Sequence, residues 1–219
     1  MIIAIDGPSA SGKSTTAKGV SNKLGFNHID TGSMYRAVTF GLIHENIMLD
    51  DRNSIISYLR NLDLKFDSNG HIILNGKNVS NAIRTVEISS KVSKISAIPE
   101  IRSKMVDFQR NIAGKSDCVL EGRDIGTVVF PNADYKFYMI ADINIRAQRR
   151  LIELKQIDES TTIEEIISSI KVRDELDSKR SHSPLKKATD AIEIDTSLLS
   201  ISQQIEKIVK IVKQNKKET

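Results

Sequence analysis

The sequence is poor in residues that would point to several classes of protein. Its 219 residues include no tryptophan and one cysteine, and aromatic residues make up only 5%. Cys118 cannot form a disulfide within the chain, and no Cys/His cluster has the spacing of a metal site. A platform for single-stranded nucleic acid needs interleaved aromatic residues on which bases stack, so this class is disfavoured.

Long apolar runs are also missing. No stretch approaches the roughly 18 apolar residues that span a bilayer. The opening segment MIIAIDGPSA has no basic region, and its apolar run is too short for a signal peptide. With 39% hydrophobic and 27% charged residues, the composition is that of an ordinary globular domain. We therefore expect a soluble, cytoplasmic protein with a mainly aliphatic core and no membrane partner.

The positive charge is concentrated at one end of the chain. The sequence has 32 basic and 28 acidic residues, a net charge of +4. From Glu206 to Thr219 there are five lysines and two glutamates, which supply +3 of that charge. A basic terminal helix without aromatic residues is typical of a solvated face, so we expect no nucleic-acid partner.

Short apolar runs alternate with helical patterns along the chain. The expected strands are residues 2–6, 119–120, 135–141 and 191–194, and the expected helices are 13–24, a segment after Ser33, 163–170 and 201–212. Strands separated by helices indicate βαβ units with right-handed crossovers. The sequence therefore predicts an α/β fold with a parallel sheet and helices on both faces.

Residues 62–80 break this rhythm. Residues 62–66 alternate with period 2, and further short strands are expected at 71–74 and 77–79. The pairs Asn69-Gly70 and Asn75-Gly76 are typical of type I′ turns, in which both central residues have positive φ. The segment predicts a small antiparallel sheet inserted into the α/β core.

The strongest motif follows the first expected strand. The segment GPSASGKS at residues 7–14 matches G-x-x-x-x-G-K-[ST] at every fixed position, between a strand and a helix. In such a loop, backbone N–H groups and the helix N-terminus cradle phosphate oxygens. Lys13 is expected to reach the β- and γ-phosphates, and Ser14 is expected to hold Mg²⁺. The motif predicts a nucleoside-triphosphate site; Gly114-Lys-Ser-Asp117 lacks the amide of a guanine reader, which disfavours a GTPase.

Several arginines suggest a second phosphate-bearing ligand. Arg36 and Arg123 each come shortly after an expected strand or its turn, and ligands of open parallel sheets bind beyond the carboxyl ends of strands. Their guanidinium groups match phosphate geometry and stay charged. Arg173, Asp177 and Arg180 are spaced to share one face of a helix. The alternative interpretation is structural ion pairing for Arg36 and Arg123, and a salt-bridged surface helix for the other three residues.

Over nearly its whole length the chain resembles the bacterial cytidylate kinases. The matching segments are IDGPSASGKST (5–15), DTGSMYR (30–36), the hairpin insert, AIRT (82–85), EGRDIGTVVFPNA (121–133), RAQRR (146–150), RDELDSKR (173–180) and IDTS (194–197). The resemblance implies a three-layer P-loop kinase core with a parallel sheet, a small antiparallel β insert in the monophosphate-binding region and a short helical lid. It implies one domain over 1–219, with the core at 1–30, 115–145 and 181–219, the CMP-binding region at 31–114 and the lid with its flanking helices at 146–180.

The resemblance also implies an activity and a set of site residues. The family transfers the γ-phosphoryl group of ATP to CMP or dCMP with Mg²⁺, and its members are expected to be monomers. The implied catalytic residues are Lys13, Arg36, Arg123 and Arg180. The implied ATP-binding residues are Gly7, Pro8, Ser9, Ala10, Ser11, Gly12, Lys13, Ser14, Thr15 and Arg149, with Ser14 as the metal ligand. The implied CMP-binding residues are Thr31, Arg36, Ser93, Arg102, Arg123, Asp124, Arg173, Asp177 and Arg180.

The implied recognition of the base by Asp124 has a chemical rationale. Cytosine offers an exocyclic amine, from which the Asp124 carboxylate can accept, whereas uracil presents a carbonyl oxygen there.

Two alternative functions of the protein stay open. One alternative is another small P-loop kinase that acts on a different nucleotide or a small metabolite. The other is a P-loop protein that binds nucleic acid through its basic tail, and truncation after Ile205 would distinguish it from a kinase.

Overall fold

The computed structural model describes residues 1–114, 116–154 and 161–215. The chain divides into two compact units. Unit 1 comprises Met1–His28 and Ser116–Thr219, and unit 2 comprises Ile29–Lys115. Part of the predicted lid, and the last two lysines of the basic tail, lie outside the described residues.

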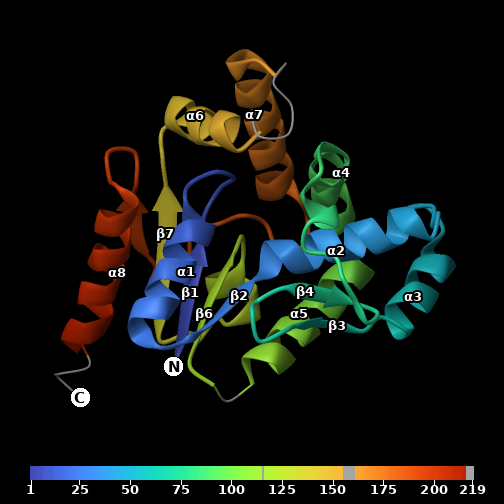
Figure 1. Ribbon diagram of the computed structural model, residues 1–219, viewed down its shortest axis with the longest axis horizontal. Coiled ribbons are helices and arrows are strands. Elements are labelled where there is room, and N and C mark those ends of the chain that lie inside the picture. Colours follow the sequence, from blue (N-terminus) through green and yellow to red (C-terminus); the bar gives the residue numbers. More distant parts are fainter. Residues whose placement is uncertain (115, 155–160, 216–219) are drawn as a thin grey trace. The chain divides into compact units, whose positions relative to one another are not determined.

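A five-stranded sheet with the order β2-β6-β1-β7-β8 forms the centre of the α/β architecture (Figure 1). Its strands are β1 (Ile2–Asp6), β2 (Asn27–Asp30), β6 (Cys118–Gly122), β7 (Tyr135–Ile140) and β8 (Ile192–Asp195). Strand β1 pairs in parallel with β6 and β7, and β7 pairs in parallel with β8. The predicted parallel sheet is therefore confirmed. The connection from β1 leads to β2 on one side of the sheet, whereas the connections from β6 and β7 lead toward the other side. The α/β proteins bind ligands beside such a change in strand order, at the carboxyl ends of the strands.

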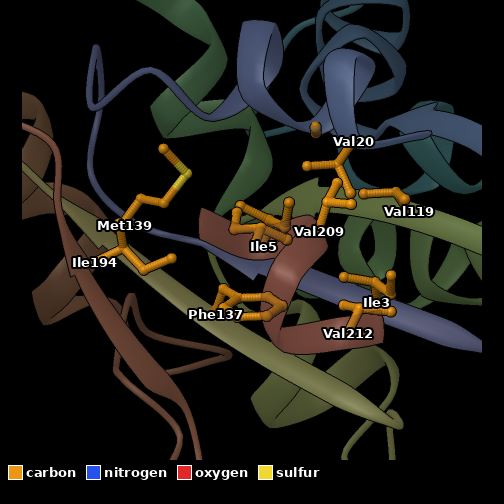
Figure 2. Close-up of a cluster of buried hydrophobic side chains, with 11 residues drawn as sticks. Ile3, Ile5, Val20, Val119, Phe137, Met139, Ile194, Val209 and Val212 are labelled. Carbon is orange, nitrogen blue, oxygen red and sulfur yellow. The ribbon is translucent and has the colours of Figure 1, made fainter. Parts of the chain in front are cut away.

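The core of unit 1 lies between this sheet and two helices, α1 (Lys13–Leu24) and α8 (Ile201–Asn215). Figure 2 shows Ile3, Ile5 and Phe137 of the strands facing Val20 of α1 and Val209 of α8. The side chains are almost all aliphatic, as the scarcity of aromatic residues predicts. Because α8 contributes Ile208, Val209 and Val212 to the core, truncation after Ile205 would remove core residues and is the wrong test of the basic tail. The lysines at 207, 210 and 213 are exposed.

Helices α6 (Ile143–Leu154) and α7 (Ile163–Lys179) form a second, smaller cluster in unit 1. Its buried residues are Ala147, Ile166 and Ile170, and Ala10 of the P-loop packs against them. Thr162 starts α7 with a capping box, because its side chain accepts from the Glu165 N–H while the Glu165 side chain accepts from the Thr162 N–H. Arg180 lies one residue beyond the helix with an extended backbone, so the condition for a shared helical face, a helix through residue 180, is met only for Arg173 and Asp177.

Unit 2 consists of helices and the small antiparallel sheet that the sequence predicts. The helical elements are α2 (Thr31–His44), α3 (Arg52–Arg60), the 3₁₀ turn η1 (Ala82–Arg84), α4 (Val86–Ser96) and α5 (Pro99–Ala113). The strands are β3 (Leu64–Phe66), β4 (Ile72–Leu74) and β5 (Lys77–Asn78), in that order, with antiparallel pairing. Helix α2 begins at an Asp30 cap whose carboxylate accepts from the Ser33 N–H at 2.9 Å.

The two Asn-Gly turns of this sheet differ. Asn75 and Gly76 have φ values of 47° and 79°, as the type I′ prediction requires. At Asn69-Gly70 only the glycine has a positive φ, 78°, so the prediction for Asn69 is wrong. There the connection is longer, and the Asp67 carboxylate closes it by accepting from the Asn69 and His71 N–H groups at 2.9 and 2.8 Å.

None of the helices in the described part of the chain has both the length and the apolar character that crossing a membrane requires.

Candidate functional site

The P-loop of unit 1 has a backbone that depends on glycine. Gly7 has a φ of 150°, and a Cβ there would lie 2.1 Å from the backbone oxygen of Met139 on β7. Gly12 has a φ of 91° and caps the N-terminus of α1. The loop therefore passes close to the backbone of β7 and leads through Gly12 into α1, whose N-terminus favours an anion.

Lys13 is buried inside this loop. Its Nζ donates to the Pro8 carbonyl oxygen at 2.5 Å and to Ser11 Oγ at 3.3 Å. Burial holds the pKa of Lys13 well below its ordinary value, and the nearby Arg123 guanidinium lowers it further. A polyphosphate placed here would favour the charged form of Lys13 and restore its pKa.

The P-loop serine is oriented by a carboxylate from β6. Ser14 Oγ donates to Glu121 Oε2 at 2.5 Å, and His28 Nε2 lies 3.2 Å from the other oxygen, Oε1. Glu121 is buried, whereas Ser14 is exposed. Since the Ser14 hydroxyl uses its single proton toward Glu121, its lone pairs are left for a cation.

Asp6, at the end of β1, joins the P-loop strand to the segment after β6. Its two carboxylate oxygens accept from the N–H groups of Ile125 and Gly126 at 2.8 and 2.7 Å. These two residues begin a π-helical turn (Ile125–Val129), for which Asp124 is the N-terminal cap residue. Burial raises the pKa of Asp6 to about 6, although both backbone hydrogen bonds act in the opposite direction.

Arginines and aspartates meet next to this turn. Arg123 Nε donates to Asp177 Oδ2 of α7 at 2.9 Å. Arg180 lies 3.8 Å from both carboxylates, its Nη1 from Asp177 Oδ1 and its Nη2 from Asp124 Oδ1. Side-chain exposure is 5–6% for Asp124, Asp177 and Arg180. The structure thus brings together four of the predicted CMP-binding residues in unit 1; Arg173 is on the same helix and half-buried.

Arg149 of α6 contacts Thr196, the residue that follows β8. Its Nη1 donates to Thr196 Oγ1 at 3.1 Å and its Nη2 to the Thr196 carbonyl oxygen at 2.6 Å. Thr196 Oγ1 in turn donates to the Ser11 carbonyl oxygen of the P-loop at 3.0 Å. Thr16 Oγ1 donates to Gln204 Oε1 at 2.7 Å, so α8 also braces this loop.

Four predicted site residues lie in unit 2. Arg102 of α5 is buried; its Nη1 donates to the Ser96 carbonyl oxygen at 3.1 Å, and its guanidinium lies 5.4 Å from the centre of the Tyr35 ring. Ser93 is one turn before Ser96 on α4, and the Ser96 hydroxyl donates to its carbonyl oxygen. The unit therefore gathers Ser93 and Arg102 around Ser96. Thr31 is buried and Arg36 half-buried on α2.

A glycine-dependent phosphate loop between β1 and α1, with a buried lysine and a carboxylate-held serine, defines a P-loop protein with a site that fits a nucleoside triphosphate. The sequence model of the family described as cytidylate kinase matches residues 3–214. The chain is 45% identical over 209 residues to the cytidylate kinase of Clostridioides difficile (strain 630), with 95% of this chain and 96% of the relative covered. It is also 45% identical over 213 residues to that of Clostridium botulinum (strain Loch Maree / Type A3), with 97% and 98% covered. The chain belongs to the cytidylate kinase family.

The fold recurs in a solved structure of much lower sequence similarity. An uncharacterized protein from Eubacterium ventriosum ATCC 27560 has a TM-score of 0.53 at 13% identity, with 98% of each chain covered. This likeness concerns the fold alone.

Several residues of the site were not among the predicted ones. They are Asp6, His28, Glu121, Thr196 and Gln204, together with Arg146 and Asp174, which contact the backbone of Ser9 in the P-loop. For Asp6, Glu121 and Thr196 a signal was present, because each stands at or just after the carboxyl end of a strand. In the parallel pairing of β1 and β6, Asp6 is opposite Gly122, so Asp6 and Glu121 lie at the same end of the sheet. The other contacts join segments far apart in the chain.

Proposed function

We propose that this protein transfers the γ-phosphoryl group of ATP to CMP or dCMP, giving ADP with CDP or dCDP. The observation that carries the proposal is the cluster of Arg123, Asp177 and Arg180 at the same sheet edge as the P-loop. One site fits a triphosphate, and the arginines beside it fit a second phosphate. Membership of the cytidylate kinase family supports the choice of substrates.

The reaction needs positioning and charge neutralisation rather than a strong protein nucleophile. An oxygen of the CMP phosphate forms the new bond to the γ-phosphorus, and the bond from that phosphorus to the β–γ bridging oxygen breaks with its electron pair left on ADP. The second pKa of a phosphate monoester is about 6, so at neutral pH the acceptor is already an oxyanion. Lys13, Arg123 and Arg180 are proposed to hold the charges in line, and no general base is required.

The residues present fit a divalent cation that is held together with the nucleotide. Within the described ranges no cluster of three or more His, Cys, Asp or Glu side chains could hold a metal alone. Mg²⁺ commonly binds through one or two protein oxygens plus phosphates and water, and Ser14 offers such an oxygen, oriented by Glu121. When bound there, Mg²⁺ would supply neutralisation of charge on the phosphate oxygens.

Recognition of the base is assigned to Asp124. Its carboxylate is buried 3.8 Å from the Arg180 guanidinium, and a carboxylate oxygen in this position can accept from the cytosine amine. Uracil would place a carbonyl oxygen against this carboxylate and leave both groups without a partner. Arg173, Asp177 and Arg180 are proposed to grip the sugar and the phosphate.

The remaining assignments rest on the family resemblance. Thr31, Arg36, Ser93 and Arg102 are proposed as CMP contacts, and Arg149 as a contact of the ATP phosphates. Arg102 is already fixed by Tyr35 and Ser96, so it could present its guanidinium without reorganisation. For localisation and assembly we propose a cytoplasmic monomer that has no nucleic-acid or membrane partner.

The test is a coupled assay of ADP formation with ATP and Mg²⁺ that compares CMP, dCMP, UMP, AMP, GMP and no acceptor. We expect turnover with CMP and dCMP to exceed that with each other acceptor by at least tenfold. The Lys13→Met variant serves as the control and should lose at least 99% of the turnover. Equal rates without acceptor would leave only an ATPase, and a preference for another acceptor would favour another small P-loop kinase.

A further inference from the structure

The tip of the P-loop is fastened to the α6–α7 pair on both sides of one residue. The Ser9 N–H donates to Asp174 Oδ1 of α7 at 3.3 Å, and the Ser9 carbonyl oxygen accepts from Arg146 Nη1 of α6 at 3.2 Å. Arg146 Nη1 also donates to Asp174 Oδ2. Ser9, Arg146 and Asp174 therefore form a closed ring of contacts, which we call the P-loop clasp.

The P-loop clasp includes a buried arginine, and apolar packing of the loop tip accompanies its polar contacts. Arg146 is 8% exposed, and within the described part of the chain its Nε has no hydrogen-bond partner. Asp174 supplies the opposite charge for this buried guanidinium. Ala10, the next residue of the loop, has a φ of 58° and packs against the apolar cluster of α6 and α7. Both the polar and the apolar contacts of the loop tip are thus made with the same two helices.

The helix that carries Asp174 also carries the proposed grip for CMP. Arg173 precedes Asp174 directly, and Asp177, which accepts from Arg123, follows three residues later. Over so short a stretch an α-helix moves as a rigid element, so a shift of the P-loop tip changes the position of the grip. Nothing in the proposed reaction requires Asp174 to touch either nucleotide.

We propose that Asp174 is a positioning residue that couples the two substrate sites: nucleotide bound in the P-loop fixes Ser9, Ser9 fixes α7 through the clasp, and α7 then holds Arg173 and Asp177 ready for CMP. This inference rests on the proposed function. An ordered loop reduces the entropy that the second ligand must lose on binding, which gives positive cooperativity. The effect is reciprocal, so CMP raises the affinity for ATP by the same factor.

The experiment is calorimetric titration of CMP into the full chain, without and with a saturating non-hydrolysable ATP analogue and Mg²⁺. For the unmodified protein we expect the analogue to lower the Kd for CMP by about 5- to 20-fold, within the usual range of such coupling. In Asp174→Ala this factor should fall below twofold, while the Kd for CMP alone changes less than threefold. Asp174→Asn keeps the size of the side chain and should lose at least half of the coupling even if the alanine variant does not fold.

Glu175→Ala provides the matched control. Glu175 is the next carboxylate on the same helix, is exposed, and pairs only with Lys179 in the described structure, so its loss should leave the coupling unchanged. Full coupling in both Asp174 variants, or no coupling in the unmodified protein, would overturn the inference while turnover with CMP still upholds the proposed function. Failure of the unmodified protein to bind or phosphorylate CMP would instead remove the proposed function as well.

Discussion

Asp124 is a buried side chain to which we assign recognition of the base. Its carboxylate lies 3.8 Å from the Arg180 guanidinium and is 5% exposed. The backbone that presents it is fixed from β1, because Asp6 accepts from the next two N–H groups. A buried carboxylate on a fixed backbone leaves an unsuitable base with an unpaired polar group, which is the condition for strong discrimination.

Replacing Asp124 with Asn should weaken the preference for CMP over UMP. The amide has the same shape, but its NH₂ group can donate to the carbonyl oxygen of uracil. We expect the ratio of kcat/KM for CMP over UMP to fall at least tenfold, about 1.4 kcal/mol. Steady-state kinetics with both acceptors measures this ratio.

Asp177→Asn is the control for that substitution. Asp177 holds Arg123 and is proposed to grip groups that CMP and UMP share, so kcat/KM should decrease for both acceptors and leave the ratio within twofold. An unchanged ratio in the Asp124 variant would mean that another group reads the base.

The site residues that the sequence predicted are those whose signal is local. Lys13 and Ser14 follow from the spacing of one loop, and the structure places both inside a P-loop. By contrast, the contacts of Thr196 with Ser11 and of Asp174 with Ser9 join residues 185 and 165 positions apart. No pattern within one segment contains such pairings, because they depend on how β8 and α7 return to the first strand.

At the scale of helices and strands, the close packing of α1 on α8 depends on a glycine, Gly19, which has no side chain. A Cβ on Gly19 would lie 2.2 Å from Cδ1 and 2.8 Å from Cγ1 of Ile205. Glycine inside a helix costs about 1 kcal/mol relative to alanine, so its presence here reflects close contact rather than helix propensity. The two helices cover the same face of the sheet (Figures 1 and 2).

Gly19→Ala should therefore destabilise unit 1 despite its better helix propensity. We expect a loss of about 1–2 kcal/mol in the free energy of unfolding, since overpacking outweighs the gain in propensity. Urea denaturation measures the loss. Adding Ile205→Val should restore part of it, because the valine lacks the atom nearest to the new methyl group.

Asn22→Ala is the control for that variant. Asn22 lies on the exposed side of α1, and alanine is the better helix former, so the substitution should be neutral or slightly stabilising. Equal stability of the Gly19 variant and the unmodified protein would show that α8 adjusts without cost.

Most elements of unit 1 could be predicted, and those of unit 2 only in part. The expected strands agree with β1, β6, β7 and β8 to within a few residues, because buried parallel strands are short apolar runs. Helices α4 and α5 were not predicted, although Ile88, Val92 and Ile95 recur at helical spacing in α4. The conformation of Asn69 could not be foreseen, because a carboxylate outside the pair closes its turn.

The pH dependence of folding is a property of the whole molecule, and Asp6 should be visible in it. Its pKa is about 6 in the folded protein and 3.8 as the ordinary value. Between these values the folded state binds more protons than the unfolded state, so the free energy of unfolding decreases as pH rises. The favourable contribution is complete below pH 3.8 and is lost as pH rises through 6.

Asp6→Asn should remove this contribution. We expect the stability difference between the unmodified protein and the variant to fall by about 2 kcal/mol from pH 4.5 to pH 7.5, from the two pKa values. Denaturant unfolding at a series of pH values measures it. The difference between the two chains cancels the titrating groups that lie far from Asp6. Asp124 and Lys13 interact with the Asp6 carboxylate and are present in both chains.

Asp107→Asn, at an exposed position of α5, is the matched control and should show no such pH-dependent difference. A constant offset between the unmodified protein and the Asp6 variant would mean that the carboxylate titrates in its ordinary range, with the two N–H donors outweighing burial. A stability difference that falls as pH rises would mean that above pH 6 the folded protein contains the buried Asp6 carboxylate in its charged form, which lowers the free energy of unfolding. That charge fixes the turn bearing Asp124, the residue assigned to read the base.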